Sequence, residues 1–192
     1  MKIILCTLIS LALIHISATD ARPDAKKSAL REVRARVVSC HDGDTCRVQE
    51  LVPVGKDAPG KFRTGEKFSV RLSGIDAPEI GQESANDAKR YLEDLLKGKE
   101  VRLMCDGRSY QRRTCEIFLG DIHVQHELVR QGWAWDSPKY SGGRYAKAQA
   151  EARKARIGIW AKDGPSLRSP ACHRAKSKQA RRNCSRDPRF QE

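Results

Sequence analysis

The sequence predicts an α+β fold, mainly β, in which helices pack on a small, mainly antiparallel sheet. Five segments have the β-rich or alternating patterns of strands, and three have apolar residues at helical spacing. With 39% apolar and 32% charged residues, the chain of 192 residues can build one core. This composition excludes wholesale disorder and a protein that crosses a membrane many times. The pattern alone leaves the topology of the sheet open.

The expected strands fall on both sides of the first helix. In the third of them, Phe68, Val70 and Leu72 alternate with other residues, as in a strand that buries one face. Residues 53–65 hold two prolines and three glycines and are expected to form a loop. The five expected strands are residues 32–41, 45–52, 67–73, 100–105 and 112–119.

Three segments are expected to be helical. The first has Leu92, Leu95 and Leu96 at helical spacing and is closed by Gly98. The third ends at Gly158, because glycine is the usual residue just past a helix. The three expected helices are residues 82–97, 123–131 and 144–156.

The two ends of the chain differ from its centre. Residues 1–19 have Lys2, an apolar run and then small residues, which is the pattern of a cleaved signal peptide. An uncleaved anchor is the alternative, but a spanning helix needs about 20 apolar residues. We expect a linker at 20–31, one domain at 32–164 and a basic tail at 165–192. The mature protein is then expected to be secreted or periplasmic, with no stable membrane association.

The charge of the chain points to a polyanionic partner. Lys and Arg number 37 against 24 Asp and Glu, a formal net charge of +13. Residues 165–192 alone hold eight Lys or Arg and two Asp or Glu, and they are expected to attract phosphate groups without reading sequence. A weaker alternative is a cationic protein that acts on membrane surfaces through this tail.

The cysteines fit an exported protein. Of the seven, Cys6 lies in the expected signal peptide. Two of the remaining pairs are placed symmetrically about a turn, where cross-strand neighbours lie close enough for a disulfide. The alternative is a zinc site that uses the first pair and His41, but no CxxC spacing supports it. The expected pairs are Cys40 with Cys46, Cys105 with Cys115, and Cys172 with Cys184.

Four acidic residues gather around two turns of this basic chain: Asp42, Asp44, Asp76 and Glu79. Carboxylate oxygens without a histidine cluster suit Ca²⁺ or Mg²⁺ better than zinc. The alternative is structural, because Asp-Gly is a common hairpin turn.

Two arginines make phosphodiester hydrolysis plausible at these turns. Arg71 lies just before the second acidic turn, and Arg112 begins the last expected strand. Guanidinium groups bind phosphate oxygens in a two-pronged manner, a carboxylate can activate water, and a divalent cation can neutralise charge. The alternative for each arginine is an exposed position on a solvated strand face.

Five motifs appear in order between residues 33 and 162. They are Asp42-Gly43-Asp44-Thr45, the segment from Arg71 to Glu79, Tyr110-Gln111-Arg112, the segment from Glu127 to Gly132, and Gly158-Ile159-Trp160. In this order and spacing they resemble the motifs of the staphylococcal nuclease (thermonuclease) family. The resemblance implies an OB-fold, a five-stranded antiparallel β-barrel with three helices. It also implies a Ca²⁺-dependent, sugar-nonspecific endonuclease that hydrolyses DNA and RNA to 3′-phosphate ends.

The resemblance also implies a role for each matching residue. Asp44 and Asp76, with the carbonyl of Ala77, would hold Ca²⁺, and Asp42 would tune these ligands through water. Arg71 and Arg112 would clamp the transition state.

Three further residues receive roles on the same ground. Glu79 becomes the candidate general base. Tyr110 resembles a residue that contacts the nucleotide, and Tyr140 is a second candidate for substrate binding.

Two positions depart from the family pattern. Ala77 stands where the founding enzyme type has Thr, which matters little if only the backbone oxygen binds metal. Gln111 stands where the family has Gly, so Arg113 competes with Arg112 for the same role. The alternative function is a non-catalytic OB-fold module that binds nucleic acid or other polyanions. A monomer is expected in either case.

Overall fold

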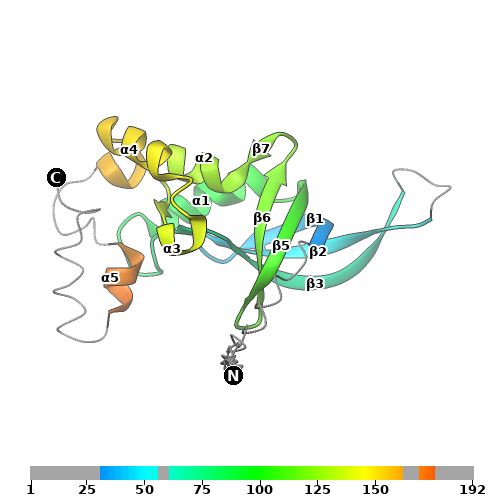
Figure 1. The fold of residues 1–192 in the computed structure, drawn as a ribbon. Coiled ribbons are helices and arrows are strands. Elements are labelled where there is room, and N and C mark those ends of the chain that lie inside the picture. The colour runs from blue at the N-terminus through cyan, green and yellow to red at the C-terminus, as the bar shows by residue number, and fades with distance from the viewer. Residues whose placement is uncertain (1–30, 56–60, 162–168, 176–192) are drawn as a thin grey trace, which may run out of the picture.

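Five strands form a closed barrel at the centre of the protein (Figure 1). The computed structural model describes residues 31–55, 61–161 and 169–175. The barrel strands are β1 (Arg31–Cys40), β2 (Thr45–Pro53), β3 (Phe62–Leu72), β5 (Glu100–Ser109) and β6 (Arg112–Leu119).

The barrel is antiparallel except where it closes. Its strands follow the order β3-β2-β1-β5-β6, and each neighbouring pair is antiparallel. The closing pair, β3 with β6, is parallel and sets Arg71 opposite Thr114. The α+β class and the OB-fold barrel are therefore confirmed, and the sheet is mainly antiparallel as expected, with one parallel pair. A parallel pair needs a long crossover, and here the chain between β3 and β6 supplies it.

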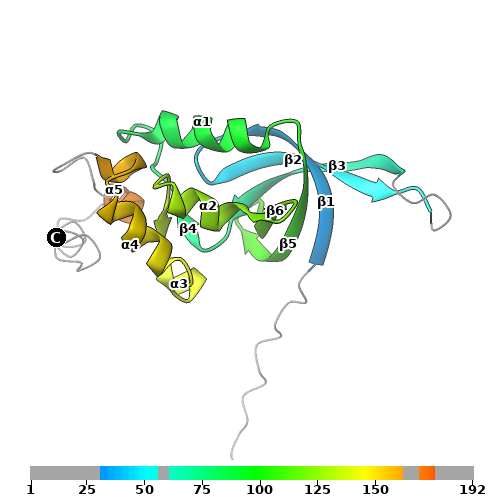
Figure 2. The same cartoon turned by 90° about the horizontal axis from the view of Figure 1, so that it is seen from above.

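All three expected helices are present, and each begins one to three residues later than expected. They are α1 (Ala85–Leu96), α2 (Val124–Arg130) and α4 (Ala146–Lys154). α1 packs against β1 and α2 against β6 (Figure 2). In the described ranges, no helix has the length and apolarity to cross a membrane.

Several short elements were not expected, because segments of two to five residues carry no usable periodicity. Two of them, α3 and α5, begin with a proline at the first helical position. The short elements are β4 (Ile75–Asp76), β7 (Ile122–His123), β8 (Trp135–Asp136), α3 (Pro138–Ser141), the 3₁₀ helix η1 (Gly158–Ala161) and α5 (Pro170–Arg174).

The expected loop at 53–65 is wrong at its two ends, because β2 includes Pro53 and β3 already begins at Phe62. Arg63 and Thr64 pair with Val52 and Leu51 of β2 and so extend the hairpin. Pairing with a neighbouring strand here overrides the weak local preference of a glycine-containing segment. β5 also continues past its expected end, to Ser109, with an irregularity between Cys105 and Gly107.

The core fills the barrel and the space beneath the helices. Leu92 and Leu96 of α1 are fully buried in the same cluster as the inward residues of the strands. A second cluster includes Trp135 and Trp160, whose rings meet edge to face with centroids 5.4 Å apart. Aromatic pairs favour this arrangement.

Two of the expected disulfides are present. Cys40 and Cys46 are register partners of β1 and β2, and Cys105 and Cys115 are register partners of β5 and β6. The zinc alternative is wrong, because the sulfurs of Cys40 and Cys46 are bonded to each other. The third pair stays a prediction, since Cys184 lies outside the described residues. The predicted signal peptide and nearly all of the linker lie outside them too.

Two glycines, Gly132 after α2 and Gly158 at the start of η1, let these two connections pack closely against each other. Gly132 has a φ of +71°, and a Cβ there would overlap the Ile157 carbonyl. Its own carbonyl accepts a hydrogen bond from the Ile159 N–H at 2.8 Å. A side chain at Gly132 would therefore meet both a backbone penalty and a clash.

We expect Gly132→Ala to lower the free energy of unfolding well beyond the loss from Gly120→Ala. Gly120 has a φ of +58° and open space around it, so alanine there meets only the left-handed penalty of about 1–2 kcal/mol. The overlap should add about 1–3 kcal/mol for Gly132→Ala. Urea unfolding of both variants measures the difference, and equal losses would contradict the packing described here.

Candidate active site

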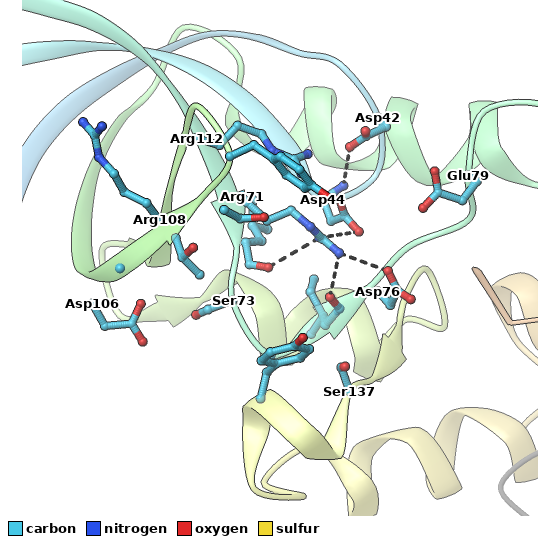
Figure 3. A pocket seen from close by; sticks show the side chains of 18 of the residues that line it. Asp42, Asp44, Arg71, Ser73, Asp76, Glu79, Asp106, Arg108, Arg112 and Ser137 are labelled. Carbon is cyan, nitrogen blue, oxygen red and sulfur yellow. Dashed lines mark hydrogen bonds and ion pairs between the residues drawn. The ribbon is translucent and has the colours of Figure 1, made fainter. Parts of the chain in front are cut away.

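A cavity of about 710 Å³ opens where the β1–β2 turn, the end of β3, the β5–β6 turn and α5 meet (Figure 3). Nearly all residues that the sequence predicted for the site line it, although they come from segments far apart in the chain. They are Asp42, Asp44, Arg71, Asp76, Glu79, Tyr110, Arg112 and Tyr140. Ala77 lies buried directly behind the wall.

Asp44 is held by the backbone of two turns. Its Oδ2 accepts a hydrogen bond from the Ala77 N–H at 2.8 Å, and its own N–H donates to Asp42 Oδ1 at 3.1 Å. Gly43 allows this close packing, because a Cβ there would press on the Cβ atoms of Ala77 and Ala88. The residue predicted to act on the metal through water, Asp42, thus stabilises the turn that carries Asp44.

Arg71 bridges the two predicted metal ligands. Its Nη1 forms an ion pair with Asp44, and its Nη2 lies 3.0 Å from Asp76 Oδ1. The same Nη2 donates to the Ile75 carbonyl at 3.2 Å. Strand pairing fixes the backbone position of Arg71, because its register partners are Thr45 on β2 and Thr114 on β6.

The burial of Asp44 has an electrostatic consequence. Burial raises the pKa of Asp44 to about 7, although the Arg71 guanidinium lowers it, and the charges of Asp42 and Asp76 raise it further. A carboxylate in such surroundings ionises favourably only beside a cation. In the structure the Arg71 guanidinium is that cation.

Arg112 reaches the same cavity from β6, and Arg113 does not. Arg112 Nη1 donates to the hydroxyl of Thr45 at 3.1 Å. Arg113 turns away, pairs with Glu66 at 3.0 Å and stacks on the ring of Phe68 at 3.8 Å. Of the two arginines that competed for one role, the geometry selects Arg112.

The glutamine in the β5–β6 turn is accommodated. Tyr110, and not Gln111, adopts the left-handed conformation, with a φ of +56°. Ser109 and Arg112 remain register partners across the turn. The departure from the family pattern therefore leaves Arg112 in place.

Thr45 is a site residue that the sequence reasoning did not single out. Its hydroxyl lies 3.3 Å from Asp44 Oδ1 and accepts the hydrogen bond from Arg112. It thereby links a predicted metal ligand to a predicted phosphate-binding group. Its place beside Asp44 in the motif was a signal, but its partner lies 67 positions away in the sequence.

Arg174 is a second site residue that the sequence did not predict. It was expected only as one of the basic residues of the tail, but it reaches the cavity. Its guanidinium pairs with both Asp76 and Glu79. Burial by itself would lower the pKa of Arg174, but the hydrogen bonds and charges of these two carboxylates raise it above its ordinary value. The tail was expected to attract phosphate, whereas this residue binds carboxylates.

The remaining predicted residues lie at the edge of the cavity. Tyr110 is 93% exposed and Tyr140 70% exposed, so neither ring belongs to the core. Among the lining residues that were not predicted are Ser73, Asp106, Arg108 and Ser137. The buried hydroxyl of Ser73 has no hydrogen-bond partner among the described residues, which leaves it available to a bound molecule.

The oxygen donors fit a hard divalent cation. Within the described part of the chain, no three His, Cys, Asp or Glu side chains are grouped as a metal centre by themselves. The predicted set needs only two such side chains, Asp44 and Asp76, together with the carbonyl of Ala77. Carboxylate and carbonyl oxygens are the donors that Ca²⁺ and Mg²⁺ prefer, with water completing the shell.

Comparison with known proteins agrees with this geometry. The sequence model of the family described as staphylococcal nuclease homologue matches residues 69–162. An uncharacterized endonuclease of Haemophilus influenzae is 35% identical over 124 residues, which are 64% of this chain and 69% of that protein. The chain belongs to the staphylococcal nuclease family. This confirms the resemblance drawn from the five motifs, and the protein is a nuclease.

Two more relatives of the nuclease differ in length. Endonuclease Htp3 of Saprolegnia parasitica is 32% identical, and the match covers 76% of this chain and 77% of that protein. The probable staphylococcal-like nuclease CAN4 of rice, Oryza sativa subsp. japonica, is 33% identical over 68% of this chain. The match covers only 26% of the rice protein, so the similarity there is confined to part of it.

We expect Thr45→Val to lower the kcat of the nuclease about tenfold, the effect of losing one hydrogen bond to a charged group. The change removes the acceptor for Arg112 but keeps the size of the side chain. Thr45→Ser should restore most of the rate, and Thr64→Val, at an exposed position of β3, should have no effect. Steady-state hydrolysis of single-stranded DNA measures all three. An unchanged rate for Thr45→Val would remove Thr45 from the site.

Proposed function

We propose that this nuclease is a Ca²⁺-dependent, sugar-nonspecific endonuclease that hydrolyses DNA and RNA and leaves 3′-phosphate ends. One observation carries the proposal: two carboxylates, a third acidic residue and two guanidinium groups line a single cavity. They are Asp44, Asp76, Glu79, Arg71 and Arg112. Phosphodiester hydrolysis needs this combination of charge and proton acceptor.

The cation would be held by Asp44, Asp76 and the carbonyl of Ala77. Bound there, Ca²⁺ would supply a positive charge that binds a phosphate oxygen and stabilises the charge of the transition state. The oxygen-only donor set supports a cation at this position. Asp42 supports it indirectly by fixing the turn of Asp44.

The side chains of the nuclease would perform the remaining steps. Arg71 and Arg112 bind the nonbridging oxygens of the scissile phosphate and keep their protons throughout. Glu79 accepts a proton from the attacking water, whose oxygen forms the new bond to phosphorus. The bond between phosphorus and the 5′-oxygen breaks, that oxygen takes up a proton, and the phosphate stays on the 3′ side.

Substrate binding would be independent of sequence. The exposed rings of Tyr110 and Tyr140 can stack on bases, a contact worth about 1–3 kcal/mol per base and tolerant of any base. The net charge of +13 favours nucleic acid of either sugar type. We propose that the protein acts as a monomer, because one chain supplies all the groups of the site.

We also propose that the nuclease is secreted or periplasmic and leaves the membrane once its signal peptide is cleaved. The pattern of residues 1–19 supports export. The disulfides Cys40–Cys46 and Cys105–Cys115 support it as well, because such bonds persist in oxidising compartments.

The decisive test is hydrolysis of single-stranded DNA and of RNA with Ca²⁺ and with a chelator. We expect cleavage of both in Ca²⁺, none in chelator, and products whose 3′ ends lose phosphate to a phosphatase. Glu79→Gln should lower kcat about 10²- to 10⁴-fold, as loss of a general base does, while substrate affinity changes little.

The matched control is Glu66→Gln, which removes the same charge at a residue that pairs with Arg113 outside the cavity. It should keep the full rate. Cleavage that persists in chelator would refute the calcium proposal, and a normal rate for Glu79→Gln would refute the role of that residue. Binding without any cleavage would favour the non-catalytic module.

A further inference from the structure

We propose that α5 is an autoinhibitory latch, in which Arg174 competes with the divalent cation for the carboxylates of the active site. The inference rests on the proposed cation site at Asp44 and Asp76. It concerns a residue of the C-terminal segment that lies outside the matched family motifs.

The contacts of Arg174 fall on the two residues that catalysis would need most. Its Nη2 lies 2.7 Å from Asp76 Oδ2, and its Nη1 lies 3.2 Å from Asp76 Oδ1. Nη1 also pairs with Glu79 Oε1. One guanidinium group therefore contacts both oxygens of a proposed metal ligand and also the proposed base.

The remaining contact of Asp76 makes the competition severe. Asp76 Oδ1 also accepts from Arg71 at 3.0 Å, so both of its oxygens already face guanidinium groups. A cation bound at Asp76 would lie against the positive charge of Arg174, and like charges at contact repel. A cation at Asp76 would therefore meet both guanidinium groups. Arg71 has a place in the proposed mechanism, on the substrate phosphate, whereas Arg174 has none, so Arg174 is the group whose contacts serve only the closed state.

α5 is built to dock and to release. Ser169 and Pro170 at its start are buried, and the Ser169 hydroxyl accepts from the Cys172 N–H at 3.3 Å. The helix has only five residues, and a helix of that length does not persist in water without tertiary contacts. Arg174 itself is 48% exposed, so it can leave its carboxylates without disturbing the core.

Release of the latch would open both functions together. With Arg174 on Asp76 and Glu79, the cation binds weakly and the base is neutralised. A sufficient concentration of cation displaces Arg174 and frees Glu79 in the same step. The apparent affinity for the cation is the intrinsic affinity multiplied by the fraction of molecules in which the latch is open. A latch that is closed in about nine-tenths of the molecules therefore lowers the apparent affinity about tenfold.

The test is Ca²⁺ binding by calorimetry to the mature chain, with Ca²⁺ alone and no substrate. We expect Arg174→Gln to bind Ca²⁺ about tenfold more tightly than the unmodified protein. The matched control is Arg108→Gln, which removes the same charge from the wall of the same cavity. This control separates direct competition for the carboxylates from a general loss of positive charge in the cavity. The Ca²⁺ affinity of Arg108→Gln should change much less than that of Arg174→Gln.

A second measurement uses the unmodified protein. Hydrogen exchange of residues 169–175 should speed up when Ca²⁺ is added, because the amides of Cys172 and His173 lose their bonds to Ser169 when α5 undocks. Exchange in the barrel strands should stay the same or slow down.

The outcomes separate the latch from the calcium site. Equal affinities of Arg174→Gln and the unmodified protein, with Asp76→Asn losing Ca²⁺, would overturn the latch alone. Equal gains in Arg174→Gln and Arg108→Gln, or unchanged exchange of α5, would also overturn it. If neither the unmodified protein nor Arg174→Gln binds Ca²⁺, the proposed calcium site falls and the latch falls with it.

Discussion

The arrangement of the site depends on one interaction, the guanidinium of Arg71 between the carboxylates of Asp44 and Asp76. A buried carboxylate is costly without a positive partner, and the raised pKa of Asp44 reflects that cost. The partner must be held in place by the fold, and the pairing of β3 with both β2 and β6 holds Arg71 there. Closure of the barrel is thus also the assembly of the site.

Two neighbouring groups each contact two residues of the site, as Arg71 does. A single hydroxyl, that of Thr45, connects Asp44 to Arg112, and a single helix end, at Arg174, covers Asp76 and Glu79. The carboxylates of Asp44, Asp76 and Glu79 therefore each have a counterpart within the chain. Substrate and cation would have to exchange these internal partners for new ones, which makes the affinity of the site a difference between two sets of contacts.

Local patterns in the sequence predicted the five strands, the three longer helices and the acidic and arginine residues of the cavity wall, whereas the barrel was predicted from the family resemblance. Alternation of apolar residues marks a strand, and Asp44, Asp76 and Glu79 stand in short motifs. The contacts of Thr45 with Arg112 and of Arg174 with Glu79 could not be predicted, since they join residues 67 and 95 positions apart. Only the folded chain brings such pairs together. The first residues of β3, from Phe62, were missed for the same reason, because their partners on β2 decide their conformation.

The two disulfides have a bearing on where the protein can work. Cys40–Cys46 closes the turn that carries Asp44, and Cys105–Cys115 closes the arm that carries Arg112. The turn with Asp44 and the hairpin with Arg112 are thus each held by a disulfide bond, which a thiol-rich cytoplasm would not maintain. A chain in which both bonds are reduced would carry its acidic and basic residues on untied turns, so its active site should be less ordered until the two disulfides form.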